Sequence, residues 1–223
     1  MVAVKRQVEL LEKNKPRQER AKRTYEAILT AAAELLVEVG VERISTNLVA
    51  ERAGITVPAL YRYFPNKYAV LHALGANLMD DQNRIFEAWF ERNMQDGDPS
   101  GLVLNVRELL QETLELTREQ TGGIEIVQAL RAVAPLREVR LESHRRVAEQ
   151  FASTASKLLD RPVDDVIISQ ARVTIEVGYA VVEMCIEDET LSTEHLLNEG
   201  AQLVRFYWEG MLAQAFGEAA TPE

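Results

Sequence analysis

The side chains best suited to bind a partner lie close together between residues 45 and 67, in the sequence STNLVAERAGITVPALYRYFPNK. Arg62 can donate two parallel hydrogen bonds to the edge of a guanine, and the small residues of Thr56–Ala59 can contact thymine methyl groups. Tyr61 and Lys67 can hydrogen-bond to phosphates, which position a protein on a duplex without specifying a sequence. These residue types predict a surface that binds double-stranded DNA. The expected contacts are Thr46, Asn47, Thr56, Val57, Pro58, Ala59, Tyr61, Arg62, Tyr63 and Lys67.

Two short helices must position these side chains. Ser45 and Thr56 can each cap the free N–H groups of a first helical turn, so a helix should begin at each of them. Gly54 permits the tight turn between the two helices, and Pro65 should end the second near Phe64. Two such helices form a helix-turn-helix, whose second helix lies in the major groove with its N-terminal end toward the bases.

Several of these residues have a second interpretation that the sequence leaves open. Thr46 and Asn47 could cap the first of the two helices instead of contacting DNA. Tyr61 and Tyr63 could be aromatic core residues. That is what we expect of Phe64, which should pack under the helix that precedes the motif.

The rest of the chain also has the pattern of helices. Apolar residues recur at steps of three and four from about 17 to 39, and Gly40 should end that helix with a positive φ. Alternating patterns typical of strands are missing, and 93–101 has the composition of a loop. We therefore expect an all-α fold of about nine helices. After the motif they span about 65–92, 102–119, 124–133, 135–159, 163–187 and 192–216.

Positive charge gathers near the N-terminal end of the chain. The net charge is −10, yet residues 1–67 hold 12 of the 25 basic residues and only 8 of the 35 acidic ones. That segment therefore carries +4 and the remainder −14. This distribution favours a phosphate-facing surface on an acidic protein, although a basic terminus can also be only a solvated tail. Contacts with phosphate or the minor groove are expected from one or two of Arg17, Arg20, Lys22 and Arg23.

The spacing of these residues resembles a known family. The pattern I-S-T-x-x-V-A-x-x-A-G-I-T-x-x-x-L-Y-x-Y-F-x-N-K-x-x-x-L is similar to that of the tetracycline-repressor (TetR) family of bacterial regulators, over roughly residues 20–71. The family often has Gly-Thr or Gly-Ser where this chain has Pro58-Ala59. That departure leaves the expected fold in place and concerns the DNA sequence that is read.

The resemblance implies a division of the chain and a function. Residues 1–67 would be a DNA-binding domain with three helices and a basic N-terminal arm, and 68–223 a larger helical domain that binds a ligand and dimerises. The resemblance implies a sequence-specific transcriptional regulator, in particular a repressor released from a near-palindromic operator by a small, largely apolar molecule. The alternative is a ligand-independent architectural or spatial-control DNA-binding protein on the same fold. A larger domain with a closed, fully packed core would favour this alternative.

The resemblance implies a ligand cavity in the larger domain, and several residues there are candidates for its wall. Phe86, Trp89 and Phe90 recur at helical spacing, as core residues or as cavity wall. Arg131, on the same short apolar helix as Val127, is either exposed or a polar anchor for a ligand, and His144 and Glu176 are similar candidates. The last two long helices carry many apolar residues, which favours a homodimer interface there. These are Val173, Val177, Ala180, Val181, Met184, Leu196, Leu203, Phe206, Tyr207 and Met211.

Other kinds of function find little support. His72, His144 and His195 are scattered, Cys185 is the only cysteine, and no phosphate-binding loop or nucleophile motif occurs. We therefore expect no enzyme, no cofactor and no metal site. A helical enzyme or adaptor that carries the same motif would need a cluster of perturbed titratable groups in a cleft. No apolar stretch long enough for a membrane span and no signal sequence is found, so a cytoplasmic protein is expected.

Overall fold

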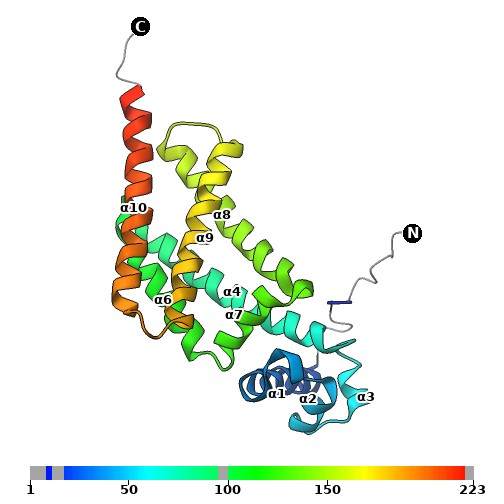
Figure 1. Ribbon diagram of the computed structural model, residues 1–223. Coiled ribbons are helices and arrows are strands. Elements are labelled where there is room, and N and C mark those ends of the chain that lie inside the picture. Colours follow the sequence, from blue (N-terminus) through cyan, green and yellow to red (C-terminus); the bar gives the residue numbers. More distant parts are fainter. Residues whose placement is uncertain (1–8, 12–17, 95–99, 219–223) are drawn as a thin grey trace, which may run out of the picture. The chain divides into compact units, whose positions relative to one another are not determined.

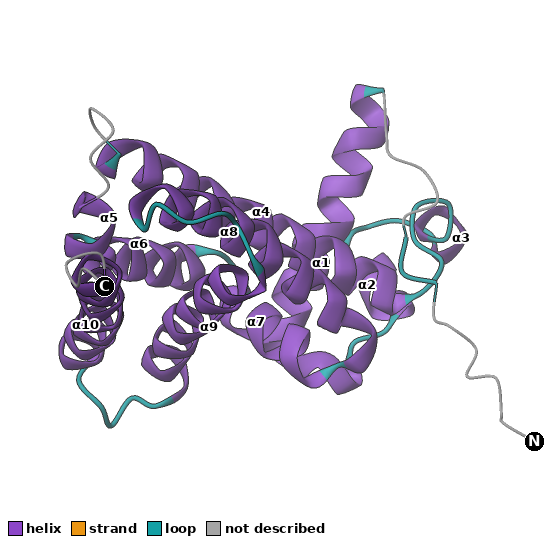
Figure 2. Cartoon of the chain, turned by 90° about the horizontal axis from the view of Figure 1, so that it is seen from above, coloured by secondary structure: helices purple, strands orange, loops and turns teal. Residues whose placement is uncertain are grey.

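The computed structural model describes residues 9–11, 18–94 and 100–218, and within these ranges it contains helices and loops but no strand (Figures 1 and 2). The all-α prediction is therefore confirmed. The described helices are α1 (Glu19–Arg43), α2 (Thr46–Arg52), α3 (Val57–Leu60), α4 (Lys67–Asn93), α5 (Ser100–Leu104), α6 (Val106–Glu119), α7 (Gly123–Ala132), the 3₁₀ helix η2 (Ala134–Leu136), α8 (Arg137–Leu158), α9 (Asp165–Glu187) and α10 (Thr193–Glu218). These described ranges hold ten α-helices instead of about nine, because the helix expected over 102–119 is interrupted at Asn105.

The chain folds as two compact units. The head unit comprises Met1–Asp80 and Thr117–Leu141, and the body unit comprises Asp81–Leu116 and Glu142–Glu223. Because α4, α6 and α8 each cross one of these limits, each contributes residues to both units. The head unit therefore extends beyond the expected domain limit at residue 67, since α7 and the first half of α4 share its core.

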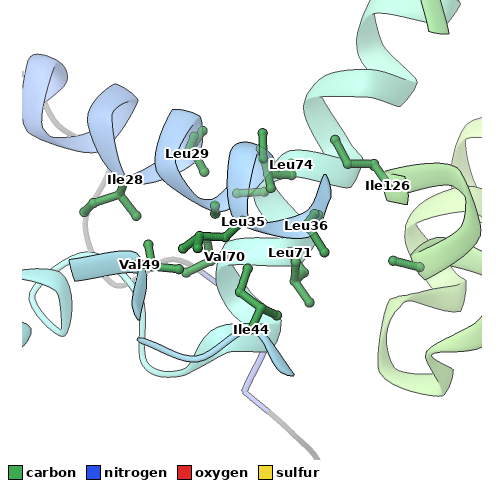
Figure 3. Packing of buried hydrophobic residues seen from close by; sticks show 14 of the residues in the cluster. Ile28, Leu29, Leu35, Leu36, Ile44, Val49, Val70, Leu71, Leu74 and Ile126 are labelled. Carbon is green, nitrogen blue, oxygen red and sulfur yellow. The ribbon is translucent and has the colours of Figure 1, made fainter. Parts of the chain in front are cut away.

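The core of the head unit is built on one face of α1. Ile28, Leu35 and Leu36 are buried there, at the three- and four-residue spacing that the sequence predicted. Figure 3 shows them gathered with side chains from the following helices. Those neighbours are Ile44, Val49, Val70, Leu71, Leu74 and Ile126. The same core therefore supports α1, α2 and α4, the elements that surround the predicted DNA-binding residues.

Gly40 has the predicted positive φ, but α1 continues after it to Arg43 instead of ending there. Its φ of 74° and ψ of 169° are not helical, and the last residues of α1 follow this break. A positive φ is costly for residues with a Cβ and cheap for glycine. The break redirects the chain so that Ile44, which is 2% exposed, enters the core just before α2.

The body unit has its own core, in which α9 and α10 pack closely against each other. Trp208 of α10 makes an edge-to-face contact with Phe151 of α8, with ring centroids 5.2 Å apart. Its Nε1 donates a hydrogen bond of 2.9 Å to Oγ1 of Thr174 on α9. Because its N–H has a partner, the buried tryptophan leaves no unsatisfied donor in the core. Trp208 thus contacts both α8 and α9 from α10.

Candidate functional site

The predicted helix-turn-helix is present in the head unit. Ser45 Oγ accepts a hydrogen bond of 3.3 Å from the backbone N–H of Leu48, and Thr56 Oγ1 accepts one of 3.4 Å from that of Ala59. Both residues are thus the N-caps that the sequence indicated. Gly54 has a φ of 66° in the turn that joins α2 to α3. These local features place the two short helices next to each other.

The second helix of the motif is shorter than expected. It ends at Leu60, although the sequence predicted a helix to about Phe64. The backbone continues in hydrogen-bonded turns, in which the N–H groups of Tyr63 and Phe64 both donate to the carbonyl of Leu60. This closing turn is compatible with the restriction that Pro65 imposes on the residue before it. Tyr61 and Arg62 therefore lie in the turn that follows α3.

The residues expected to contact DNA divide into two groups by exposure. Asn47, Thr56, Pro58, Tyr61 and Arg62 are exposed. The half-buried group consists of Thr46, Val57, Ala59, Tyr63 and Lys67. The exposed group offers amide, hydroxyl and guanidinium hydrogen-bonding groups on α2, α3 and the adjoining turn. It is therefore the part of the motif available to a large partner.

Thr46 and Tyr61 connect the two helices of the motif. Thr46 Oγ1 and Tyr61 Oη are 3.1 Å apart, and either hydroxyl can be the donor. Tyr61 remains 41% exposed despite this bond. A hydroxyl can donate one hydrogen bond and accept others, so both groups can also bind an outside partner.

Tyr63 and Phe64 face the interior of the head unit. Phe64 is 0% exposed, as expected, and its ring stacks on that of Tyr25 with centroids 5.2 Å apart. Tyr63 is half-buried and contacts Tyr25 edge to face at 6.3 Å. Of the two interpretations of Tyr63 that the sequence left open, this packing favours the core residue.

Lys67 has a role that sequence reasoning missed. Its Nζ donates to the backbone carbonyls of Val41, Glu42 and Ile44, each at 3.2 Å. An ammonium group has three protons, so these three acceptors match its donors. The carbonyl groups at the end of a helix lack partners within the helix, and Lys67 supplies one. It thereby joins the start of α4 to the end of α1.

Asn66 adds a second connection at the same place. Its Oδ1 accepts a hydrogen bond of 3.1 Å from the N–H of Ala69, which caps α4, and its Nδ2 donates to the carbonyl of Glu9 at 2.9 Å. The cap could have been predicted from the sequence, because asparagine is a preferred residue just before the first turn of a helix. The contact with residue 9 could not be predicted, because no local pattern connects the two segments.

Arg52 fastens α2 to α1. Its Nη1 and Nη2 lie 2.8 and 2.6 Å from the two carboxylate oxygens of Glu38, and Nη1 lies 3.2 Å from Glu34. The hydrogen bonds from Arg52 hold the pKa of Glu38 below its ordinary value. Hydrogen bonds from Glu38, and then from Glu34, raise the pKa of Arg52. The sequence held one indication of this contact: Glu34 and Glu38 are four residues apart, which places both on one side of α1.

The basic residues before this core are described only in part. Arg20, Lys22 and Arg23 are exposed on the first turns of α1, where Lys22 Nζ lies 2.8 Å from Glu19. Arg17 and residues 1–8 and 12–16 of the basic arm lie outside the described residues.

Comparison with known proteins agrees with this geometry. The family model described as "Bacterial regulatory proteins, tetR family" matches residues 28–74, which contain the core of α1, the helix-turn-helix and the start of α4. This segment of the chain is therefore similar to the DNA-binding domain of the TetR family. The match therefore confirms the resemblance that the spacing of residues 44–71 indicated.

Relatives with known names match a limited part of this chain. Tetracycline repressor protein class C of Escherichia coli is 46% identical over 54 residues, which are 24% of this chain and 25% of that protein. The A-factor receptor protein of Streptomyces griseus is 36% identical over 83 residues, 37% of this chain and 27% of that protein. The chain thus matches only about a quarter of the length of these relatives.

Solved structures extend the likeness to the whole fold. A TetR-family transcriptional regulator from Streptomyces coelicolor is 28% identical with a TM-score of 0.60, over 85% of this chain and 99% of that one. A transcriptional regulator described as putative, from Pseudomonas aeruginosa PAO1, has a TM-score of 0.68 over 91% of this chain and 96% of its own. At 15% identity it shows the fold alone.

The body unit contains an apolar cavity. The space inside it that a water-sized molecule can occupy is about 60 Å³. Phe86 and Trp89, both expected as wall residues, line it. The other lining residues are Gln82, Val106, Leu109, Leu110, Thr113, Val147, Phe151, Thr174, Ile175, Gly178, Tyr179, Val182 and Val204.

The other expected pocket residues lie elsewhere. Phe90 packs beside Phe86, with centroids 5.8 Å apart, but does not line the cavity. Val127 belongs to the core of the head unit, and Arg131 is exposed on the same helix. Neither reaches the cavity of the body unit, because the apolar face of α7 packs against α1.

His144 and Glu176 lie behind the cavity wall and do not line it. His144 is 1% exposed, and its Nδ1 lies 3.1 Å from Oε1 of Glu176. That carboxylate also accepts a hydrogen bond of 2.8 Å from Arg172. The imidazole ring stacks on Tyr179, with centroids 3.9 Å apart and an angle of 8° between the planes. The pair thereby braces Tyr179, which does line the cavity.

Among the described residues, no group of three or more His, Cys, Asp or Glu side chains is placed to hold a metal ion. No described helix combines the length and apolar character that a membrane span requires.

Proposed function

We propose that this chain is a sequence-specific DNA-binding transcriptional regulator that reads its operator with α3 and the turn after it. The observation that carries the proposal is the exposed group on the capped helix-turn-helix, held in place by α1 and α4 through Arg52 and Lys67. A rigid, solvent-facing short helix with small residues at its start is the shape that major-groove recognition needs.

Each exposed side chain of the motif is assigned a role by its chemistry. Arg62 makes a bidentate contact with guanine, while Thr56 and Pro58 contact thymine methyl groups. Tyr61 and Asn47 bind phosphate oxygens and set the register of the protein on the duplex. Thr46 supports Tyr61 through the bond between their hydroxyls. Lys67 acts within the protein, because its three protons already point at carbonyl oxygens.

The distribution of charge supports this assignment. Residues 1–67 carry a net charge of +4 and the remaining residues −14. An acidic body disfavours DNA, so attraction to phosphates acts through the basic segment alone.

A homodimer is proposed through α9 and α10. Val166 and Val173 on α9 and Leu203 and Phe206 on α10 are between 51% and 63% exposed. Large apolar side chains exposed on neighbouring helices mark an interaction surface. A two-fold dimer would present two copies of the motif to a near-palindromic operator.

Release by a small molecule is proposed from the cavity of the body unit. The cavity favours a ligand-responsive repressor over the ligand-independent alternative, which a fully packed body would favour. The helix α4 supplies a physical link, because Val70 and Leu71 at its start support the motif while Phe86 and Trp89 at its end line the cavity. An occupied cavity is expected to lower the affinity of the motif for its operator.

DNA binding is tested with the full-length chain and the DNA upstream of its own coding region. Fluorescence anisotropy should show specific binding whose affinity falls steeply as salt rises. Unrelated DNA of the same length should bind at least a hundredfold more weakly. Equal affinity for both DNAs would contradict sequence-specific regulation.

A further inference from the structure

The cavity of the body unit carries information about its occupant. We infer that it takes an uncharged molecule with a flat apolar body and one hydrogen-bonding group, oriented with that group toward Gln82. This inference rests on the proposed function, in which the cavity is the effector site, and it names the chemical class of the effector.

The absence of charge in the wall excludes ionic occupants. Among the described residues that line the cavity, none is Asp, Glu, Lys, Arg or His. An ion buried without a partner loses its hydration and gains nothing in return. A carboxylate or an ammonium compound is therefore disfavoured against a neutral molecule of the same shape.

Most of the polar groups near the wall already bind other protein atoms. Thr113 Oγ1 donates to the carbonyl of Leu109 at 2.8 Å, and Thr174 Oγ1 donates to that of Gln170 at 2.9 Å. The same Thr174 oxygen accepts from Trp208, and Trp89 Nε1 donates to the carbonyl of Asn105 at 3.0 Å. These threonine and tryptophan protons are thus committed to the protein.

Gln82 differs from these groups in its capacity. Gln82 lines the cavity, and the residue is 2% exposed. A carboxamide has two protons and an oxygen with two lone pairs, so it can bind a ligand hydroxyl or carbonyl in addition to a protein group. It is the natural partner for the single polar group of an otherwise apolar molecule.

The aromatic wall favours a flat molecule. Phe86, Trp89, Phe151 and Tyr179 all line the cavity, and flat rings pack well against such faces. Tyr179 is fixed from behind by its stacking on His144. A braced ring cannot turn to admit a bulkier body without breaking that stack.

Three matched probes test the inference by isothermal titration calorimetry with the full-length protein and no DNA. They are 2-naphthol, naphthalene and 2-naphthoate, which share one ring system and differ in their polar group. We expect 2-naphthol to bind at least tenfold more tightly than 2-naphthoate and at least threefold more tightly than naphthalene, as one net hydrogen bond predicts. Equal or tighter binding of 2-naphthoate, or no binding of any probe, would overturn the inference.

Variants of Gln82 test whether this residue causes the preference for 2-naphthol over naphthalene. Gln82→Leu should bind 2-naphthol no more tightly than naphthalene while keeping its affinity for naphthalene, and Gln82→Met serves the same purpose if the first variant does not fold. Gln128→Leu, on an exposed position of the head unit, should behave as the wild type. A retained preference for 2-naphthol in the Gln82 variant would contradict the inference. A loss of DNA binding with these affinities intact would contradict only the proposed function.

Discussion

The hydroxyl groups of Thr46 and Tyr61 lie 3.1 Å apart and join the two helices of the proposed DNA-binding motif. Thr46 begins α2, and Tyr61 directly follows α3. The bond therefore fixes the exposed tyrosine relative to the helix that precedes the turn. A phosphate contact by Tyr61 benefits from this, because a preorganised side chain loses less freedom on binding.

Removal of the Tyr61 hydroxyl should weaken DNA binding without changing the preferred sequence. Tyr61→Phe loses one phosphate contact, which is worth about 1 kcal/mol or roughly a fivefold loss of affinity. The loss should be the same on the best operator and on unrelated DNA, as measured by fluorescence anisotropy. Glu194→Gln, at an exposed position of the body unit, is the control and should bind as the wild type. A Tyr61→Phe protein with altered base preference would show that the tyrosine reads bases.

Replacement of Lys67 should destabilise the head unit. Lys67→Met removes three hydrogen bonds from a charged donor, and we expect the free energy of unfolding to fall by about 1–3 kcal/mol. Thermal or urea unfolding followed by circular dichroism measures this. A different result would identify Lys67 as a phosphate ligand. In that case the stability would be unchanged, and the slope of log affinity against log salt would fall by about one.

The pair Glu38–Arg52 should give a small pH dependence of stability. The pKa of Glu38 is lowered from its ordinary value of 4.5 in the folded protein, mainly by its hydrogen bond with Arg52. Its contribution is therefore fully present above pH 4.5 and disappears as the pH falls through the lower folded-state value. The melting temperature of the wild type should exceed that of Glu38→Gln near neutral pH, and the difference should vanish in acid.

The control for that experiment is Glu26→Gln, which is also exposed on α1. It should follow the wild-type curve. A difference between wild type and Glu38→Gln that grows as the pH falls would contradict the direction of the pKa shift.

A larger side chain at Gly178 should block the cavity and spare DNA binding. Gly178 lines the cavity, and an added Cβ would lie 3.3 Å from the Leu110 side chain, so the further atoms of Gly178→Leu must occupy cavity space. We expect at least a tenfold loss of 2-naphthol affinity by calorimetry, with operator affinity within twofold of wild type. Unchanged probe binding in this variant would place the ligand elsewhere.

Charge on the exposed face of α10 should separate the proposed dimer. Phe206 is 63% exposed, and Phe206→Glu would place a carboxylate in the interface, where an unpaired charge is costly. Light scattering after size-exclusion chromatography should show a dimer for the wild type and a monomer for the variant. Val37→Glu, at a 55% exposed position of α1, should remain dimeric. A dimeric Phe206→Glu protein would exclude this surface.

Local rules predicted the elements of the motif well. The caps at Ser45 and Thr56 and the positive φ at Gly40 depend only on residues nearby in the sequence, and all are present. The bonds of Lys67 depend on the meeting of two segments 23 to 26 residues apart, which no local pattern encodes. The same limit explains why Val127 was expected in the cavity but lies in the core of the head unit. The spacing of apolar residues shows which face of a helix is buried, but it does not show which element covers that face.

Cavity walls are harder to predict for a related reason. Phe86 and Phe90 are alike in type and lie one turn apart, yet Phe86 lines the cavity and Phe90 packs beside it. Gln82 and Gly178 were missed, because a polar residue or a glycine on a long helix gives no sign of facing a cavity. Only the packing of several helices decides which side chains remain uncovered.

The proposed DNA-binding surface is tested most directly by the double variant Tyr61→Ala/Arg62→Ala. Its anisotropy titration against the upstream DNA should be compared with that of Glu194→Gln, on α10, as control. Both side chains are exposed, so the fold should be retained, which circular dichroism checks. We predict that the double variant loses at least a hundredfold in operator affinity while the control binds as the wild type. Full affinity in the double variant would show that this helix-turn-helix is not the surface that binds DNA.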